Sequence, residues 1–161
     1  MSPAFLIAAD RTLGIEGGYV NNPKDPGGET KWGISKRSYP HLNIKDLTRD
    51  DALEIYYRDF WAHVDGDSLP QSVAYQLFDI AINHGCETAK RMLQRTVGVA
   101  DDGHIGPITR AAVARHSETD MIMKLIAERL EFWAKLSIFD EFGRGWANRA
   151  AADLRYGAQD T

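Results

Sequence analysis

The sequence predicts a mainly α-helical fold with a long loop or a small hairpin after the first helix. Apolar residues recur at helical spacing along most of the 161-residue chain. The exception is the segment from Tyr19 to about Lys45, which is rich in turn-forming residues and has little periodicity. Because long irregular segments in compact domains are usually functional, this segment is the first place to expect a site.

The first helix is expected at the start of the chain. Its apolar face carries, at helical spacing, Phe5, Ala8, Ala9, Thr12 and Glu16. The glycine pair that follows is typical of a helix end, because glycine readily adopts the left-handed conformation of a C-terminal cap. Glu16 is therefore expected at a helix end, in line with an apolar stripe.

The remaining helices are predicted from their caps and their apolar spacing. Thr48 and Asp51 form a plausible capping pair for the second helix. Later helices are expected over 70–85, 87–97 and 107–115, the last opening at a proline. Ser117 is expected to cap the longest helix, and a closing helix is expected from Arg144. We expect a catalytic region over 1–85 and a helical C-terminal region over 86–161, packed as one compact unit.

Composition and charge exclude several classes of protein. The chain is 43% hydrophobic and 26% charged, as in ordinary globular domains, and lacks an apolar run of about 18 residues, so no stable membrane insertion is expected. A net charge of −4 opposes binding to nucleic acid. The single cysteine, Cys86, cannot form an intrachain disulfide, and the histidines lack metal-binding spacing. We expect a monomer without metal or cofactor.

The N-terminal apolar patch is short and is interrupted at Asp10 and Arg11, unlike a signal peptide. We therefore expect synthesis in a cytoplasm. A target outside the membrane would then be reached through a holin pore, another export route or lysis.

Glu16 and Asp25 are candidates for paired carboxylate chemistry. Glycosidic cleavage needs one protonated acid and a second carboxylate that stays ionised. Burial against an apolar face raises the pKa of a carboxyl group, which suits Glu16 as the acid, whereas Asp25 in a polar loop would stay ionised. From spacing alone the alternative stands that Glu16 is a surface residue and that Asp25 only caps a turn.

Four ordered sequence blocks resemble glycoside hydrolase family 108, the phage endolysin and secretion-linked muramidase family. They are EGGYVNNPKDPGGETKWGIS from Glu16, FDIAINHG from Phe78, DDGHIGPIT from Asp101 and FGRGWANR from Phe142. The resemblance covers nearly the whole chain, and the later blocks are similar to a C-terminal peptidoglycan-binding region. It implies a lysozyme-like helical fold and hydrolysis of the β-1,4 bond between N-acetylmuramic acid and N-acetylglucosamine in peptidoglycan.

The same resemblance implies roles for three residues. It assigns the general acid to Glu16, and it assigns to Asp25 and Thr30 the other places of a Glu, Asp, Thr triad. If Asp25 and Thr30 hold a water on the far face of the sugar, the reaction inverts, with carboxyls about 6.5 to 9.5 Å apart. The alternative role of Thr30 is to cap a loop.

Four more residues are candidates for substrate binding. Asp79 and Asn83 share one helix face and could contact sugar or peptide, or could form a polar core pair. Tyr19 and Trp32 flank the proposed acid and base, and their rings suit sugar surfaces or the core.

We therefore predict a muramidase that lyses cell walls, either a phage endolysin or a bacterial secretion muramidase. A lytic transglycosylase would use the glutamate without a catalytic aspartate. A non-catalytic module for wall binding or secretion would bind peptidoglycan and release nothing. A cysteine peptidase built on Cys86 and His84 is disfavoured, because residues two apart on a helix point to different sides.

Overall fold

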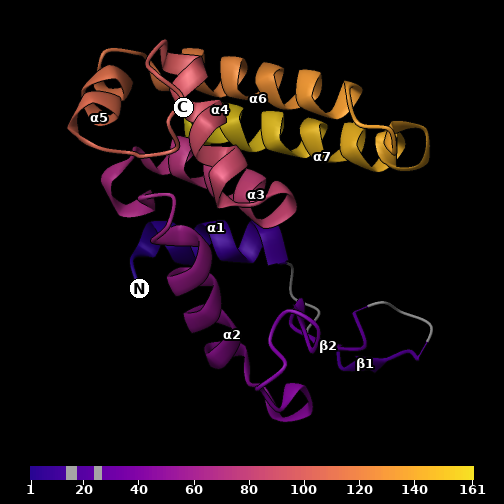
Figure 1. Ribbon diagram of the computed structural model, residues 1–161. Helices are drawn as coiled ribbons and strands as arrows, with labels where there is room; N and C mark the ends of the chain where they lie inside the picture. Colours follow the sequence, from indigo (N-terminus) through magenta and orange to yellow (C-terminus); the bar gives the residue numbers. More distant parts are fainter. Residues whose placement is uncertain (14–17, 24–26) are drawn as a thin grey trace. The chain divides into compact units, whose positions relative to one another are not determined.

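The computed structural model describes residues 1–13, 18–23 and 27–161 (Figure 1). The chain divides into two compact units, Met1–Asp59 and Phe60–Thr161. The described residues are mainly helical and include one small antiparallel sheet. This confirms the predicted fold class, including the small hairpin after the first helix.

The helices of the first unit bury the residues that the sequence pattern selects. Helix α1 (Pro3–Leu13) buries Phe5, Ala8 and Ala9. After the short 3-10 helix η1 (Ile44–Asp46), helix α2 (Arg49–Tyr56) begins at a capping box. In this box the Thr48 side chain accepts from the Asp51 backbone, and the Asp51 side chain accepts from the Thr48 backbone. The predicted capping pair is therefore confirmed.

The sheet of the first unit consists of three short strands in the order β1–β2–β3. Strand β2 (Glu29–Lys31) pairs antiparallel with β1 (Val20–Asn21) on one side and with β3 (Ile34–Ser35) on the other. Lys31 pairs with Ile34, so β2 and β3 are joined by a two-residue turn at Trp32 and Gly33. Both turn residues have positive φ, 53° and 75°, as a tight hairpin turn requires.

The second unit is a helical array that begins within the π-helix η2 (Tyr57–Trp61). Its later elements are the 3-10 helix η3 (Gly66–Ser68) and helices α3 (Gln71–His84), α4 (Cys86–Val97), α5 (Pro107–Ala114), α6 (Glu118–Ala134) and α7 (Phe139–Asp160). Helix α3 packs against α4, α6 and α7, and α6 runs beside α7 (Figure 1). Because α3 lies among three helices, every residue from Ser72 to Ala81 is buried.

Most helix ends in this unit follow the predicted signals. Gly98 ends α4 in the left-handed conformation, Pro107 opens α5, and the Ser117 side chain accepts from a backbone N–H of α6. Two expectations were wrong. Helix α7, with 22 residues, is longer than the 17-residue α6, and it begins at Phe139 rather than near Arg144. Gly143 and Gly145 weaken a helix locally, but Trp146, the next residue, stacks on Trp133 of α6 and stabilises this part of α7.

The division between the two compact units falls between Asp59 and Phe60. Residue 85 lies between α3 and α4, which pack closely together inside the second unit. Within the described ranges, none of the helices combines the length and the apolar character that crossing a membrane requires.

Candidate active site

Glu16 and Asp25, the predicted acid and its partner carboxylate, lie outside the described residues. The described part of the candidate site therefore consists of the end of α1, the three-stranded sheet and the β2–β3 turn. All of these belong to the first unit.

Thr30 occupies the middle position of the central strand. It pairs with Val20 of β1 and with Ser35 of β3, and its side chain is partly buried. Because successive side chains of a strand alternate between faces, Thr30 lies on the opposite face from Glu29 and Lys31. Thr30 is therefore held by strand pairing on both sides.

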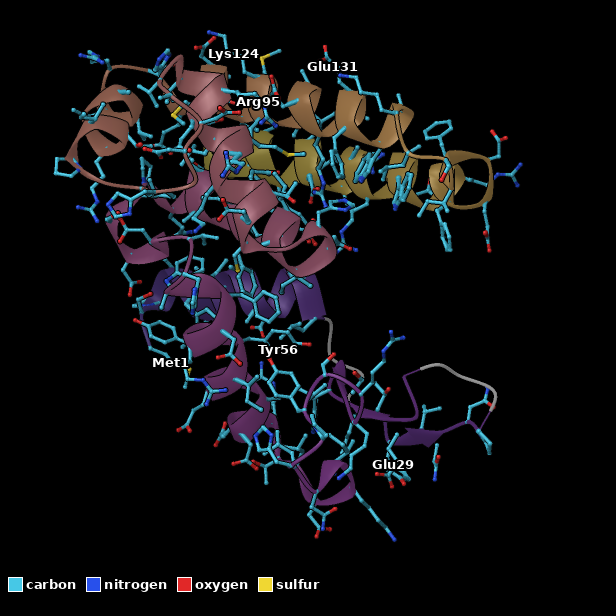
Figure 2. All side chains as sticks on the ribbon, viewed as in Figure 1. Met1, Glu29, Tyr56, Arg95, Lys124 and Glu131 are labelled. Carbon is cyan, nitrogen blue, oxygen red and sulfur yellow. The ribbon has the colours of Figure 1, made fainter. Side chains whose placement is uncertain are left out.

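Tyr19 and Glu29 form a hydrogen-bonded pair on the sheet. The Tyr19 hydroxyl donates to Glu29 Oε1 at 2.6 Å, and the ring is 37% exposed. This hydrogen bond raises the pKa of Tyr19 above its ordinary value, because it favours the protonated hydroxyl. Glu29, labelled in Figure 2, is a carboxylate next to Thr30 that our sequence reasoning did not single out. Its place beside Thr30 in the ETK stretch was the only available signal.

The turn at Trp32 is strained and closely packed. A bulky residue at φ 53° is unusual and costs roughly 1–3 kcal/mol, so its surroundings must hold it there. The Tyr56 hydroxyl donates to the Trp32 carbonyl at 3.2 Å. Tyr56, labelled in Figure 2, is buried, which raises its pKa to about 12 and keeps it a donor. A Cβ on Gly33 would lie 2.4 Å from the Tyr56 hydroxyl oxygen, so only glycine fits there.

The Trp32 side chain joins the hairpin to both helices of the first unit. It lines a small apolar pocket together with Ala9 and Leu13 of α1 and Ala52 and Leu53 of α2. Its Nε1 is buried and has no hydrogen-bond partner among the residues described. Leu13 is the last residue of α1 and precedes Glu16 by three positions. Trp32 thus connects the turn beside Thr30 to the helix that leads toward Glu16.

Asp79 belongs to a buried charge network of the second unit. Arg149 donates to it through Nε at 2.9 Å and Nη2 at 2.7 Å, and Arg129 Nη1 lies 2.7 Å from Oδ2. Burial alone would raise the pKa of Asp79, but the Arg149 hydrogen bonds and the Arg129 charge hold it below its usual value. Asn83 donates to the Asp79 backbone carbonyl at 2.7 Å. This geometry favours the interpretation of Asp79 as a core residue.

His84 lies in an aromatic cluster of the same unit. Its Nε2 accepts from Trp133 Nε1 at 2.5 Å, and its ring contacts Phe132 and Trp146. Burial lowers the pKa of His84 to about 4, so the ring is neutral near neutral pH. A neutral ring whose Nε2 already accepts a hydrogen bond is poorly placed to activate the Cys86 thiol. In the described part of the chain, no three His, Cys, Asp or Glu residues gather as metal ligands.

Comparisons with known proteins found two matching families and similar solved structures. A family described as Glycosyl hydrolase 108 matches residues 9–85, and a family described as Predicted Peptidoglycan domain matches residues 88–151. The solved structure of SagA from Brucella abortus is similar, with a TM-score of 0.82 and 37% sequence identity over 96% of this chain and 94% of that chain. Among curated proteins, none matches.

Proposed function

This chain belongs to the glycosyl hydrolase 108 family of peptidoglycan-degrading glycosidases, and we propose that it is an N-acetylmuramidase of the lysozyme type. Its proposed reaction is hydrolysis of the β-1,4 bond between N-acetylmuramic acid and N-acetylglucosamine. The family match over residues 9–85 is the observation that carries this proposal, because it spans the end of α1, the sheet, α2, α3 and both predicted carboxylates. The peptidoglycan-domain match over 88–151 supports the same polymer as substrate.

Glu16 is the proposed general acid. A general acid must keep its proton near neutral pH, and a carboxyl group does so when apolar surroundings raise its pKa. Leu13, three positions before Glu16 in the sequence, lines an apolar pocket with Trp32 and Leu53, which supports this assignment. Glu16 would protonate the oxygen of the leaving sugar as the glycosidic bond breaks.

Asp25 and Thr30 are the proposed partners of the acid. An ionised Asp25 would either activate a water or stabilise the positive charge that develops on the sugar. The Thr30 hydroxyl, held in the central strand, would position that water. Tyr19, exposed on the sheet, remains the proposed ring contact to sugar.

The proposed biological role is lysis or opening of the bacterial cell wall. We place synthesis in the cytoplasm and action at the wall after release, through a holin or another export route. The proposed active species is a monomer, because each protein must reach a large insoluble polymer.

The deciding experiment is release of reducing sugar ends from purified sacculi by the wild type and by Glu16→Gln. Loss of the acid should lower the rate by about two orders of magnitude or more in a folded variant. Glu54→Gln, which neutralises an exposed carboxylate of α2, is the matched control and should retain full activity. Circular dichroism checks folding of all three proteins.

Mass spectrometry of the products separates the alternatives. Hydrolysed muramic acid ends agree with a muramidase, whereas anhydro-muramic ends would identify a lytic transglycosylase. Binding to sacculi without release by any variant would identify a binding module. Full activity of Glu16→Gln would contradict the role of Glu16.

A further inference from the structure

Aromatic rings form a ladder where α6 joins α7. Trp133, 1% exposed, stacks on Trp146 with ring centroids 5.5 Å apart and planes at 10°. Trp146 in turn stacks on Phe142 at 6.0 Å and 29°. Phe142 is the outermost ring and is 47% exposed. The paired ends of the two helices project beyond α3 and α4 in Figure 1, and ring side chains gather there in Figure 2. A rigid ring is thus presented to solvent with a packed support behind it.

Gly145 leaves an open position beside this ring. On a helix, Phe142, Gly145 and Arg149 are neighbours at spacings of three and four. Apart from its chain neighbours and the nearby backbone of its own helix, no described atom comes within 4 Å of the place that a Cβ on Gly145 would take, and its φ is not positive. Gly143 differs, because a Cβ there would lie 3.0 Å from the Phe139 ring. Packing therefore explains Gly143 but not Gly145, and glycine is otherwise favoured where a ligand approaches the backbone closely.

Arg149 places a fixed positive charge on the other side of Gly145. Its paired hydrogen bonds to Asp79 use Nε and Nη2, so Nη1 is the nitrogen outside the pair. The side chain is 32% exposed. The hydrogen bonds to Asp79 raise the pKa of Arg149, so its charge is present throughout the ordinary pH range. A held guanidinium loses little conformational freedom when it binds an anion.

We propose that Phe142, Gly145 and Arg149 form an accessory binding site for the peptidoglycan strand. The apolar face of an acetamido sugar lies on Phe142 and over the Gly145 backbone, while a carboxylate of the strand accepts from Arg149. This inference rests on the proposed function for the identity of the polymer. The site belongs to the second unit, outside the residues of the candidate active site.

Peptidoglycan is the occupant that fits these features. The three residues lie inside the 88–151 range that matches the peptidoglycan domain. The polymer repeats sugar rings, which suit an aromatic face, and carries carboxylates on its lactyl groups and stem peptides, which suit an arginine. The protein has a net charge of −4, so a local cation is needed to hold an anionic strand.

The test is co-sedimentation of the full chain with purified sacculi across a range of sacculus concentrations. Phe142→Ala should bind about five-fold more weakly, since it removes the stacking face. Gly145→Leu fills the open position and should bind at least as weakly, while its melting temperature stays equal or rises, because leucine favours a helix. Opposite changes in binding and stability are not expected from a purely structural residue.

Two controls match these variants. Leu154→Ala truncates another apolar side chain of α7, 45% exposed, and Ala147→Leu places the same leucine side chain at another exposed position of α7. Both should bind sacculi like the wild type. Equal binding by Phe142→Ala, Gly145→Leu and the wild type would overturn the site, as would equal weakening by the controls.

A second measurement separates this inference from the proposed function. Soluble, uncrosslinked glycan strands at saturating concentration should be hydrolysed by Phe142→Ala at the wild-type kcat. A wild type that releases no reducing ends but sediments in a Phe142-dependent manner would support the site and contradict the muramidase. A lowered kcat of Phe142→Ala on soluble strands would overturn its role as an accessory site.

Discussion

The β2–β3 turn of the first unit and the charge network of the second unit both join separate elements, but they rely on different interactions. The turn depends on a strained Trp32, a glycine without space for a side chain and one hydroxyl from Tyr56. The network joins α3, α6 and α7 through Asp79, Arg129, Asp153 and Arg149, of which all but Arg149 are buried.

This difference predicts which property a substitution in each region changes first. The turn lies beside the candidate active site, so a small steric change there should affect activity. The network lies in a core of ring stacks and packed helices, so a change of charge there should affect stability first. Three predictions test this contrast, from the largest expected effect to the smallest.

Removing Arg129 should have the largest effect on stability. Arg129 is 1% exposed, bonds Asp153 at 2.7 Å and lies 4.6 Å from the centroid of the Trp133 ring. Arg129→Met leaves two buried carboxylates without this partner, so the free energy of unfolding should fall by about 3–5 kcal/mol. Urea denaturation measures the change.

A double variant identifies the cause of that loss. Arg129→Met with Asp153→Leu removes one of the two carboxylates and should recover part of the lost stability. If the double variant is no more stable than Arg129→Met, lost packing rather than unpaired charge explains the effect.

Gly33→Ala should destabilise the first unit by about 2–3 kcal/mol, through the positive φ and the contact with Tyr56. Gly28→Ala is the matched control, because Gly28 has φ 68° and no described atom within 4 Å of the Cβ position. The free energy of unfolding of Gly28→Ala should fall by only about 1–2 kcal/mol. Hydrogen exchange, read separately for peptides of each unit, measures both changes.

Hydrolytic activity should also depend on the steric contact between a Cβ at position 33 and the Tyr56 hydroxyl. Hydrolysis of sacculi should fall further in Gly33→Ala than in Gly28→Ala, and Tyr56→Phe should partly rescue Gly33→Ala, since the close atom is the hydroxyl oxygen. Equal losses in both glycine variants would show that the contact with Tyr56 contributes nothing.

His84 should give the smallest effect, seen in the pH dependence of stability. Its pKa falls from the ordinary 6.5 to about 4 in the folded chain. Between these values the unfolded state binds a proton that the folded state does not, so stability falls as pH decreases from about 6.5 to 4. Partial exposure reduces this contribution to about 1 kcal/mol.

Titration of Asp153 changes stability in the opposite direction over an overlapping pH range. Burial raises its pKa from 3.8 to about 6, so its contribution is present at low pH and is lost as pH rises between these values. Urea denaturation of the wild type and of His84→Gln across this range isolates the histidine. Parallel pH profiles of the two proteins would contradict the assignment to His84.

Local signals were sufficient for most of the helix ends. Thr48, Gly98, Pro107 and Ser117 each act through the nearest turn of backbone, so the sequence alone locates them. The start of α7 was misplaced because two glycines argued locally against a helix, while a stabilising contact comes from Trp133 of α6, on which Trp146 stacks.

The candidate site was predictable only in part. Motif order marked Glu16, Asp25 and Thr30, and the first two lie outside the described residues. Trp32 and Asp79 carried two interpretations each, because a sequence shows that a side chain is aromatic or acidic and not what surrounds it. The pocket around Trp32 and the arginines around Asp79 come from elements far apart in the chain.

The sequence by itself determined the helical class, the irregular segment after the first helix and the family, because these depend on spacing and on motifs read along the chain. Only the tertiary structure decided that Trp32 joins two helices, that Asp79 is paired inside a core, and that Arg149 is held by Asp79 while Phe142 is exposed. The physical reason is that burial, charge pairing and exposure depend on neighbours that folding brings together from distant positions.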